Sequence, residues 1–271
     1  MNVFISADIE GIGGVMSRAH QGPDSPDYQR ACAWMVQEVN AAVEGALAGG
    51  AKRILVKDSH NNGTNIDLNK LHPAAELISG WGPLGSMVEG LDESFDAFFL
   101  IGYHARAMTI DGTLAHTWSS NVLEMTINGK PHGEAAWAAL YAGHYNVPLA
   151  LVAGDDKLAA QVRSELPGGF LTVTTKTGWT PTSARLRPLK QVHDEIRAAA
   201  TKSLADLKAL AVYRPTLPLT LTLRFRNWEN VNACAVVPHV RRLDAQTIEV
   251  QAVDAIEAQK YFVTLHRLAR S

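Results

Sequence analysis

The chain opens with Met1-Asn2-Val3-Phe4-Ile5-Ser6-Ala7-Asp8, a short apolar run that ends in a carboxylate. Its β-branched and aromatic residues predict a buried strand over residues 3–7. The run lacks the basic start and the long apolar core of a signal peptide. None of the apolar runs in the sequence approaches the roughly 18 residues that a membrane span needs. We therefore expect a cytoplasmic protein with no membrane partner.

Further apolar runs alternate with helical patterns through the first half of the chain. Ser25-Pro26 is typical of a helix start, and Gly49-Gly50 is typical of its end. A second helix is predicted over residues 134–145, and Asn128-Gly129 predicts a hairpin turn. Buried-type strands are predicted at residues 53–57, 97–102, 122–127 and 148–153. This alternation predicts an α/β fold, with a mostly parallel sheet and helices on both of its faces.

The second half of the chain has a different pattern. Threonine alternates with leucine within residues 217–225, which predicts a half-buried strand. The other elements expected here are two helices and two strands, at residues 182–210, 256–268, 170–175 and 247–253. We therefore expect an α/β domain over residues 1–160 and a smaller α+β domain over residues 161–271. The sequence contains no long linker, so the two parts are expected to pack as one body.

Composition excludes several classes of protein. The chain carries 25 basic and 27 acidic residues and has no basic block, so a nucleic-acid partner is not expected. Two cysteines, Cys32 and Cys234, are too few for a disulfide scaffold or a cysteine-rich metal site, and they suit a reducing compartment. Histidine, by contrast, occurs ten times. A transition metal in this protein would therefore be held by histidines and carboxylates.

Metal-binding residue types follow three of the predicted strands. Asp8 and Glu10 come after the first strand. His60 follows the second strand, and His104 follows a later one. Because the carboxyl ends of parallel strands share one edge of a sheet, these side chains are expected to meet there, and Glu134 at the start of its helix could join them. Two imidazoles and three carboxylates form a ligand set for one or two divalent metals, with zinc favoured and manganese or cobalt as alternatives.

Each of these residues also has an ordinary structural explanation. Asp8 could cap a turn, and Glu134 could stabilise its helix through the helix dipole. Their joint placement favours a metal site, although the spacing matches no short metal-binding motif. The alternative class is a small-molecule-binding α/β protein without chemistry. Against it, residues 8–14 carry two carboxylates instead of a G-x-G-x-x-G loop, and these would repel a pyrophosphate unless a metal intervened.

The sequence resembles the zinc D-aminopeptidase family in a series of ordered blocks. Residues 6–12, Ser-Ala-Asp-Ile-Glu-Gly-Ile, resemble the opening S-x-D-x-E-G-I motif of that family. The later blocks are Asp58-Ser59-His60, Leu71-His72-Pro73, Met87-Val88-Glu89-Gly90-Leu91-Asp92, Gly102-Tyr103-His104-Ala105-Arg106-Ala107, Gly133-Glu134 and Val152-Ala153-Gly154-Asp155-Asp156. The resemblance runs from residue 3 to residue 157 and is weak after residue 160.

This resemblance implies a dinuclear zinc peptidase with two Zn²⁺ ions per subunit. The implied metal ligands are Asp8, Glu10, His60, His104 and Glu134. A further histidine of the family, proposed there as a catalytic group, matches His116 in Ala115-His116-Thr117. It would act as a general acid–base or as a nucleophile. The resemblance also implies a two-domain α/β protein that assembles into a decameric ring.

Three functions are compatible with these features. The first is an aminopeptidase that releases the N-terminal residue of short peptides or amino-acid amides, with D-amino acids as the family default and β- or glycine-like residues as alternatives. The second is a metal-dependent amidase acting on a small non-peptide amide. The third is a non-catalytic small-molecule-binding α/β protein. Stereochemical preference depends on pocket side chains that the sequence does not identify.

Other residues near the strand ends are candidates for supporting roles. Metal-bound imidazoles usually need an outer hydrogen-bond partner, and Asp58 and Asn61 could provide it. Arg106 and Asp155 could contact substrate or hold the ligands. Aromatic residues that could line the pocket are Tyr103 and Trp118. The histidines expected to be non-ligands are His20, His72, His132, His144, His193, His239 and His266.

Overall fold

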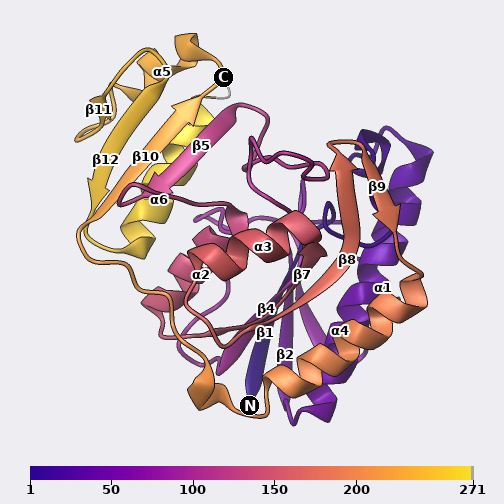
Figure 1. Cartoon of the computed structure of the whole chain (residues 1–271). Coiled ribbons are helices and arrows are strands. Elements are labelled where there is room, and N and C mark those ends of the chain that lie inside the picture. The colour runs from indigo at the N-terminus through magenta and orange to yellow at the C-terminus, as the bar shows by residue number, and fades with distance from the viewer. Residues whose placement is uncertain (270–271) are drawn as a thin grey trace.

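The computed structural model describes residues 1–269, which form two β-sheets with helices packed against them (Figure 1). Within these residues the larger sheet has seven strands. Its strands, in spatial order, are β3 (Ala75–Ile78), β2 (Arg53–Asp58), β1 (Asn2–Ala7), β4 (Ala97–Tyr103), β7 (Leu149–Asp155), β8 (Leu171–Thr180) and β9 (Ser183–Leu186). Every neighbouring pair is parallel except β8 and β9, which are antiparallel. The predicted mostly parallel sheet is therefore confirmed.

β1 lies in the middle of the larger sheet, between β2 and β4. Its residues from Val3 to Ala7 are all buried. Val3 and Ile5 contribute to the hydrophobic core on one face, whereas Phe4 contributes to the core on the other face. Because both faces are covered, the strand is apolar along its length instead of alternating with polar residues.

Helices cover the larger sheet on both faces. On one face, residues of α1 (Pro26–Ala48) and α4 (Leu189–Ser203) join the core. On the other face, α2 (Glu134–His144) and α3 (Asp156–Glu165) do so. No helix within residues 1–269 combines the length and the apolar character that a membrane crossing requires.

α1 begins and ends where the sequence predicts. The Ser25 hydroxyl accepts a hydrogen bond from the Asp27 backbone N–H at 3.2 Å, and Pro26 occupies the first helical position. Gly49 follows the last helical residue. These are the capping interactions that satisfy the unpaired backbone groups of a helix end.

The smaller sheet is antiparallel. Its strands, in spatial order, are β11 (Arg241–Arg242), β12 (Thr247–Ala252), β10 (Leu219–Phe225), β5 (Val122–Ile127) and β6 (Lys130–Pro131). Residues of α6 (Ala255–Leu268) and α5 (Trp228–Cys234) complete its hydrophobic core. Figure 1 shows α6 lying along one face of this sheet. The core positions of β10 are its three leucines and Phe225, which confirms the predicted alternation.

α6 also joins the smaller sheet to the larger one. Phe262 of α6 packs against Trp137 of α2, with ring centroids 5.2 Å apart, and against Trp118 at 4.4 Å. The Trp137 indole N–H donates to the Gln259 side-chain oxygen at 2.6 Å. Two layers that share one aromatic cluster are expected to unfold together.

We expect the Phe262→Ala substitution to lower the free energy of unfolding by about 3–5 kcal/mol, because it removes a buried ring that packs against two tryptophans. Chemical denaturation followed by intrinsic fluorescence measures this change. Thr264→Ala, at an exposed position of the same helix, is the control and should change stability by less than about 0.5 kcal/mol. An equal loss in both variants would contradict the assignment.

The predicted long helix over residues 182–210 is wrong. β9 occupies its beginning, α4 spans its middle, and a short 3₁₀ helix, η2 (Leu207–Ala209), follows near its end. Pro188 explains the break, since proline restricts the preceding residue to extended backbone and starts a helix more readily than it continues one. β3, α3 and α5 are also absent from the predicted elements, and the longest of them, α3, has 10 residues.

The strands of the two sheets come from both sides of residue 160. β5 and β6 of the smaller sheet precede that residue, whereas β8 and β9 of the larger sheet follow it. The sheets are therefore not divided at residue 160. The assignment of pocket and oligomer contacts to residues 161–271 stays a prediction.

Candidate functional site

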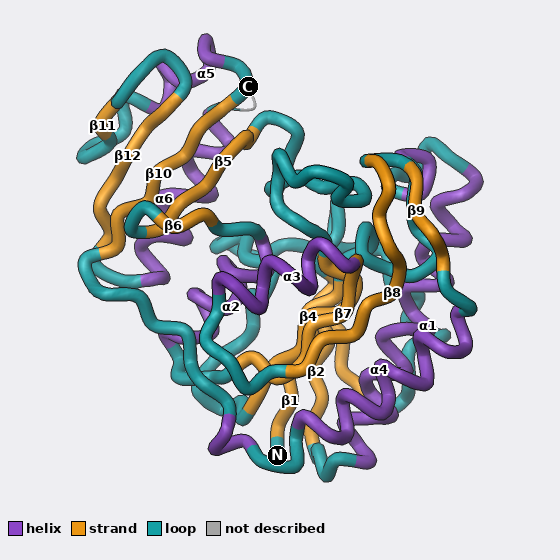
Figure 2. The backbone as a smooth tube through the Cα atoms, in the orientation of Figure 1, coloured by secondary structure: helices purple, strands orange, loops and turns teal. Residues whose placement is uncertain are grey.

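Three neighbouring strands of the larger sheet bring the predicted site residues together. β2, β1 and β4 lie side by side, and each ends at the same edge. Asp8 and Glu10 follow β1, His60 follows β2, and His104 follows β4 directly. Figure 2 shows long loops (teal) at this edge, between the larger and the smaller sheet.

Gly11 allows the loop after β1 to pack closely against the end of β4. The Gly11 backbone N–H donates to the Gly102 carbonyl at 2.7 Å. A Cβ atom on Gly11 would lie 1.8 Å from the carbonyl oxygen of Tyr103, so a larger residue cannot occupy this position without moving the backbone. This close approach turns Asp8 and Glu10 toward His104.

His60 points one ring nitrogen at the two carboxylates of the β1 loop. Its Nδ1 lies 3.2 Å from Asp8 Oδ1 and 3.2 Å from Glu10 Oε2. Its Nε2 lies 2.7 Å from the Gln21 carbonyl oxygen, so Nε2 carries a proton, and Nδ1 is the nitrogen left to bind a metal when the ring is neutral. Gln21 also donates from its side chain to Glu10 Oε1 at 2.7 Å.

Gln21 is thus the outer partner of this imidazole, and sequence reasoning missed it. Asp58 has a different role, because its carboxylate accepts from the Ile66 backbone N–H at 2.8 Å and from the Asn65 side chain at 2.7 Å. It fixes the loop that carries His60. Asn61 contributes its carbonyl to the Trp81 indole N–H at 2.7 Å.

His104 faces the other side of Asp8. Its Nε2 lies 3.4 Å from Asp8 Oδ2 and 3.3 Å from Glu134 Oε2, while its Nδ1 lies 2.9 Å from the Ala105 carbonyl oxygen. The two oxygens of Asp8 therefore point at different imidazoles, one at His60 and one at His104. Glu134, at the first position of α2, closes the cluster.

His116 lies at the rim of this cluster. Its ring stacks on that of His104, with centroids 4.2 Å apart and planes 12° apart. Nδ1 lies 2.9 Å from the Leu114 carbonyl oxygen, and Nε2 lies 3.9 Å from Glu134 Oε1. The His116 side chain is 25% exposed, compared with 1% for His104.

Residues of β7 and of the β8–β9 turn hold the loop that carries His116. Asp155 accepts from the Thr113 backbone N–H at 3.0 Å, and it also caps α3 by accepting from Leu158 N at 2.8 Å. The Leu114 backbone N–H donates to the Pro181 carbonyl at 2.8 Å. Asp155 therefore positions the loop and does not contact the cluster through these bonds.

Burial and mutual charge set the protonation of the cluster. Burial, reinforced by the neighbouring Glu10, raises the pKa of Asp8 to about 8. Burial acts to raise the pKa of Glu10 too, but the charge and hydrogen bond of His60 outweigh it and hold that pKa well below its usual range. Burial acts to lower the pKa of His104, yet Glu134 outweighs it and raises the pKa to about 10. In the metal-free cluster, protons are shared between the carboxylates and the imidazoles. Divalent cations would replace these protons.

Three buried polar atoms in the cluster lack a hydrogen-bond partner and are of the kinds that bind metal ions. Within residues 1–269, Asp8 Oδ2, Glu10 Oε2 and His104 Nε2 make no contact with hydrogen-bond geometry, although neighbouring site atoms lie 3.2–3.4 Å away. Buried polar groups without partners are rare and call for a missing ion or water. Two overlapping sets place one ligand atom per residue within 4.8 Å of one another: Asp8, Glu10 and His104, and His104, His116 and Glu134.

A cavity of about 750 Å³ opens onto this cluster. Its lining includes Asp8, Glu10, His60, His116 and Glu134. Other residues from distant parts of the chain complete it, among them Arg18, Trp81, Trp118, Arg226, Phe262 and Arg267. Trp118 thus lines the cavity as expected. Tyr103 is fully buried, and its hydroxyl bonds to Ser6 Oγ at 2.7 Å, so its role is packing.

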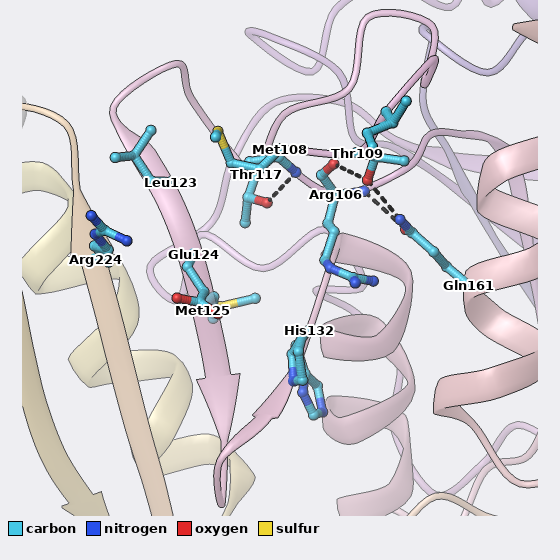
Figure 3. Close-up of a pocket in the computed structure, with 13 residues that line it drawn as sticks. Arg106, Met108, Thr109, Thr117, Leu123, Glu124, Met125, His132, Gln161 and Arg224 are labelled. Carbon is cyan, nitrogen blue, oxygen red and sulfur yellow. Dashed lines mark hydrogen bonds between the residues drawn. The ribbon is translucent and has the colours of Figure 1, made fainter.

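A second cavity, of about 620 Å³, lies beside the first and shares Ala107, Met108 and Leu123 with it (Figure 3). Its lining includes Arg106, which forms an ion pair with Glu165. The Gln161 side chain donates to Thr109 Oγ1 at 2.6 Å on the same wall. The predicted metal ligands and His116 lie outside this lining, so we assign the chemistry to the larger cavity.

A parallel α/β sheet with buried carboxylates and imidazoles at its carboxyl edge, beside a cavity of substrate size, defines a metal-dependent hydrolase of the α/β class. The comparisons with known proteins agree. The family model described as D-aminopeptidase matches residues 1–264. The chain belongs to the D-aminopeptidase family, and the predicted aminopeptidase class is confirmed.

A curated sequence and a solved structure, both from Bacillus subtilis, match over nearly their full length. A D-aminopeptidase of strain 168 is 32% identical over 272 residues, which cover 99% of this chain and 98% of the relative. The solved structure of the Zn-dependent D-aminopeptidase DppA, described as a self-compartmentalizing protease, superposes with a TM-score of 0.96 at 30% identity. That comparison covers 100% of this chain and 98% of the other. The resemblance therefore extends beyond residue 160.

Proposed function

We propose that this chain is a zinc-dependent aminopeptidase that releases the N-terminal D-amino acid of short peptides or amino-acid amides, with two Zn²⁺ ions per subunit. The observation that carries the proposal is the buried cluster in which Asp8 turns one oxygen to His60 and the other to His104. Asp8 would bridge two metals, with Glu10 and His60 on one and His104 and Glu134 on the other. Bound zinc would lower the pKa of a coordinated water and polarise the scissile carbonyl.

His116 is proposed to carry the proton transfers. Its Nδ1–H is directed to the Leu114 carbonyl, which leaves the Nε2 lone pair of the neutral ring on the side of Glu134 and the cavity. Burial, together with the charge of His104, lowers the pKa of His116. The ring is therefore neutral at pH 7 and can accept a proton. This arrangement favours general acid–base action over nucleophilic attack.

The cavity lining supports a short peptide as substrate. Arg18, Arg226 and Arg267 reach the cavity from three different parts of the chain. A peptide whose amino end lies at the acidic cluster would bring its terminal carboxylate toward these cations, and arginine recognises carboxylates well. A small non-peptide amide would not use them, which makes the amidase the second candidate.

We also propose that the chain forms a closed homo-oligomer in the cytoplasm. The self-compartmentalizing relative supports an assembly, and the family resemblance implies ten subunits. Cys32 and Cys234 are buried and unpaired, which suits a reducing compartment. Sedimentation equilibrium of the purified protein measures the subunit number.

The substrate class is tested with matched D-, L- and β-aminoacyl p-nitroanilides and dipeptides. We expect kcat/KM for D-alanyl substrates to exceed that for their L-counterparts by at least about 100-fold, because a shaped pocket must reject the inverted side chain. Prolonged chelation should abolish the hydrolysis, and added Zn²⁺ should restore it; Mn²⁺ and Co²⁺ are tested beside it.

Three outcomes of this panel would overturn parts of the proposal. Hydrolysis of L-substrates alone would refute D-specificity, and hydrolysis that survives chelation would refute the metal mechanism. Binding of substrates without hydrolysis in the presence of every metal would favour the non-catalytic alternative. Hydrolysis of simple amides in preference to peptides would favour the amidase.

A further inference from the structure

A buried lysine contacts the loop that carries Glu10. Lys176 of β8 is fully buried, and its ammonium donates to three backbone carbonyls of this loop: Glu10, Ile12 at 2.8 Å and Val15 at 2.6 Å. An ammonium in a protein interior is costly unless hydrogen bonds replace its water. Here, three carbonyls satisfy the three donors of the ammonium.

Two further side chains contact the same loop. Thr175, also on β8, donates from its hydroxyl to the Gly11 carbonyl at 2.5 Å. Glu38 of α1 accepts from the Gly13 backbone N–H at 2.7 Å and is itself fully buried. Residues 10, 11, 12, 13 and 15 are therefore each bound through the backbone by a side chain from another element.

The geometry of this contact bears on the carboxylate of Glu10. Lys176 binds the carbonyl of Glu10 itself, so it fixes the backbone from which that side chain reaches toward His60. Without the ammonium, the Glu10 and Val15 carbonyls would lose this buried donor, and the Ile12 carbonyl would keep only its bond from the Val15 backbone N–H. The loop would then be expected to rearrange, and the carboxylate of Glu10 would lose its direction.

We propose that Lys176 is a positioning residue, which presets the Glu10 loop and thereby sets the metal affinity of the site. This inference rests on the proposed metal site. It assigns part of the affinity to β8, a strand of the second half of the chain, whereas the proposed ligands all lie before residue 160. Thr175 supports the same loop through one hydrogen bond and should contribute less.

The test measures the zinc affinity of purified Lys176→Met by competition with a chromophoric chelator. We expect the dissociation constant for Zn²⁺ to rise about 10–100-fold, as for other residues that orient metal ligands. Saturating Zn²⁺ should restore kcat to within about threefold of the parent value, since the ligands and His116 are intact. The matched control is Lys190→Met, which removes an exposed lysine of α4 and should leave zinc affinity unchanged.

A purely structural role would give a different result. It would lower the melting temperature of the metal-free protein while leaving the zinc dissociation constant unchanged, and this outcome would overturn the proposal. If Lys176→Met does not fold, Thr175→Val carries the test, with Thr177→Val on the same strand as its control. We expect about 3–10-fold weaker zinc binding for Thr175→Val, and parent-like affinity would overturn the proposal.

The experiment separates this inference from the proposed function. Failure of the parent protein to bind Zn²⁺ would refute the metal site, whatever the variants do. Tight zinc binding in the parent, together with equal affinity in Lys176→Met, or in Thr175→Val where Lys176→Met does not fold, would refute the positioning role and leave the aminopeptidase proposal intact.

Discussion

Asp8→Asn is expected to abolish zinc binding and to lower kcat/KM by at least about 1,000-fold, or roughly 4 kcal/mol of transition-state stabilisation. The asparagine keeps the size of the side chain but removes the charge that faces both His60 and His104. Its amide nitrogen would also replace one of the two oxygens directed at these imidazoles. This isosteric residue therefore cannot serve in the bridging position that we propose for Asp8.

Metal content and thermal stability give two independent measurements of this effect. The parent protein should gain about 4 kcal/mol of stability for each zinc site at a free Zn²⁺ concentration 1,000 times the dissociation constant, because zinc binds the folded state. Asp8→Asn should gain little or none. Without metal, the variant should have a free energy of unfolding at least as high as that of the parent. The parent buries the ionisable carboxyl group of Asp8 beside Glu10, and the neutral asparagine avoids that cost.

Asp24→Asn is the matched control, because Asp24 is exposed and precedes α1. This variant should keep the zinc content, the thermal gain and the activity of the parent. If Asp8→Asn retained the zinc content and most of the activity of the parent, then Asp8 would not bridge the metals.

The clustering of Asp8, Glu10, His60 and His104 follows from a topological rule. Each residue comes after a strand of the parallel sheet, and the three strands are neighbours, so their ends coincide. His116 was harder to place because it lies in the loop between β4 and β5, which has no periodic pattern, and Glu134 was harder to place for another reason. The chain makes a detour through β5 and β6 of the smaller sheet before it returns to α2, and no periodic pattern shows where such a detour ends.

Residues that support the site were poorly predicted, because their contacts involve backbone groups, which do not depend on the type of residue. Gln21 holds His60 through a backbone carbonyl, which every residue possesses. Lys176 and Glu38 also bind backbone groups, at sequence separations of 164 residues for Lys176 and Ile12 and 25 residues for Glu38 and Gly13. The helix predicted over residues 182–210 failed for a related reason: strand pairing of β9 with β8 outweighs a local helical pattern.

His116→Ala is expected to keep the parent zinc content and to lower kcat by about 100- to 10,000-fold, the range typical of a lost general acid–base. KM should change little, because the cavity lining is otherwise intact. Elemental analysis gives the zinc content, and steady-state kinetics on a D-alanyl substrate gives kcat. Added imidazole should restore part of the activity, since the substitution opens space beside His104 at the rim of the cavity.

The same variant decides between two roles that the geometry of His116 permits. His104, His116 and Glu134 offer ligand atoms close enough to hold one metal, so His116 could in principle act as a ligand. Loss of one zinc per chain in His116→Ala would assign it that role, whereas full activity would exclude any catalytic role. His239→Ala, at an exposed histidine, is the control and should match the parent in both measurements. We expect metal retention with lost turnover, because Nδ1 is bonded to Leu114 and Nε2 lies 3.9 Å from Glu134 Oε1, farther than the 3.3 Å that separates His104 from the same carboxylate.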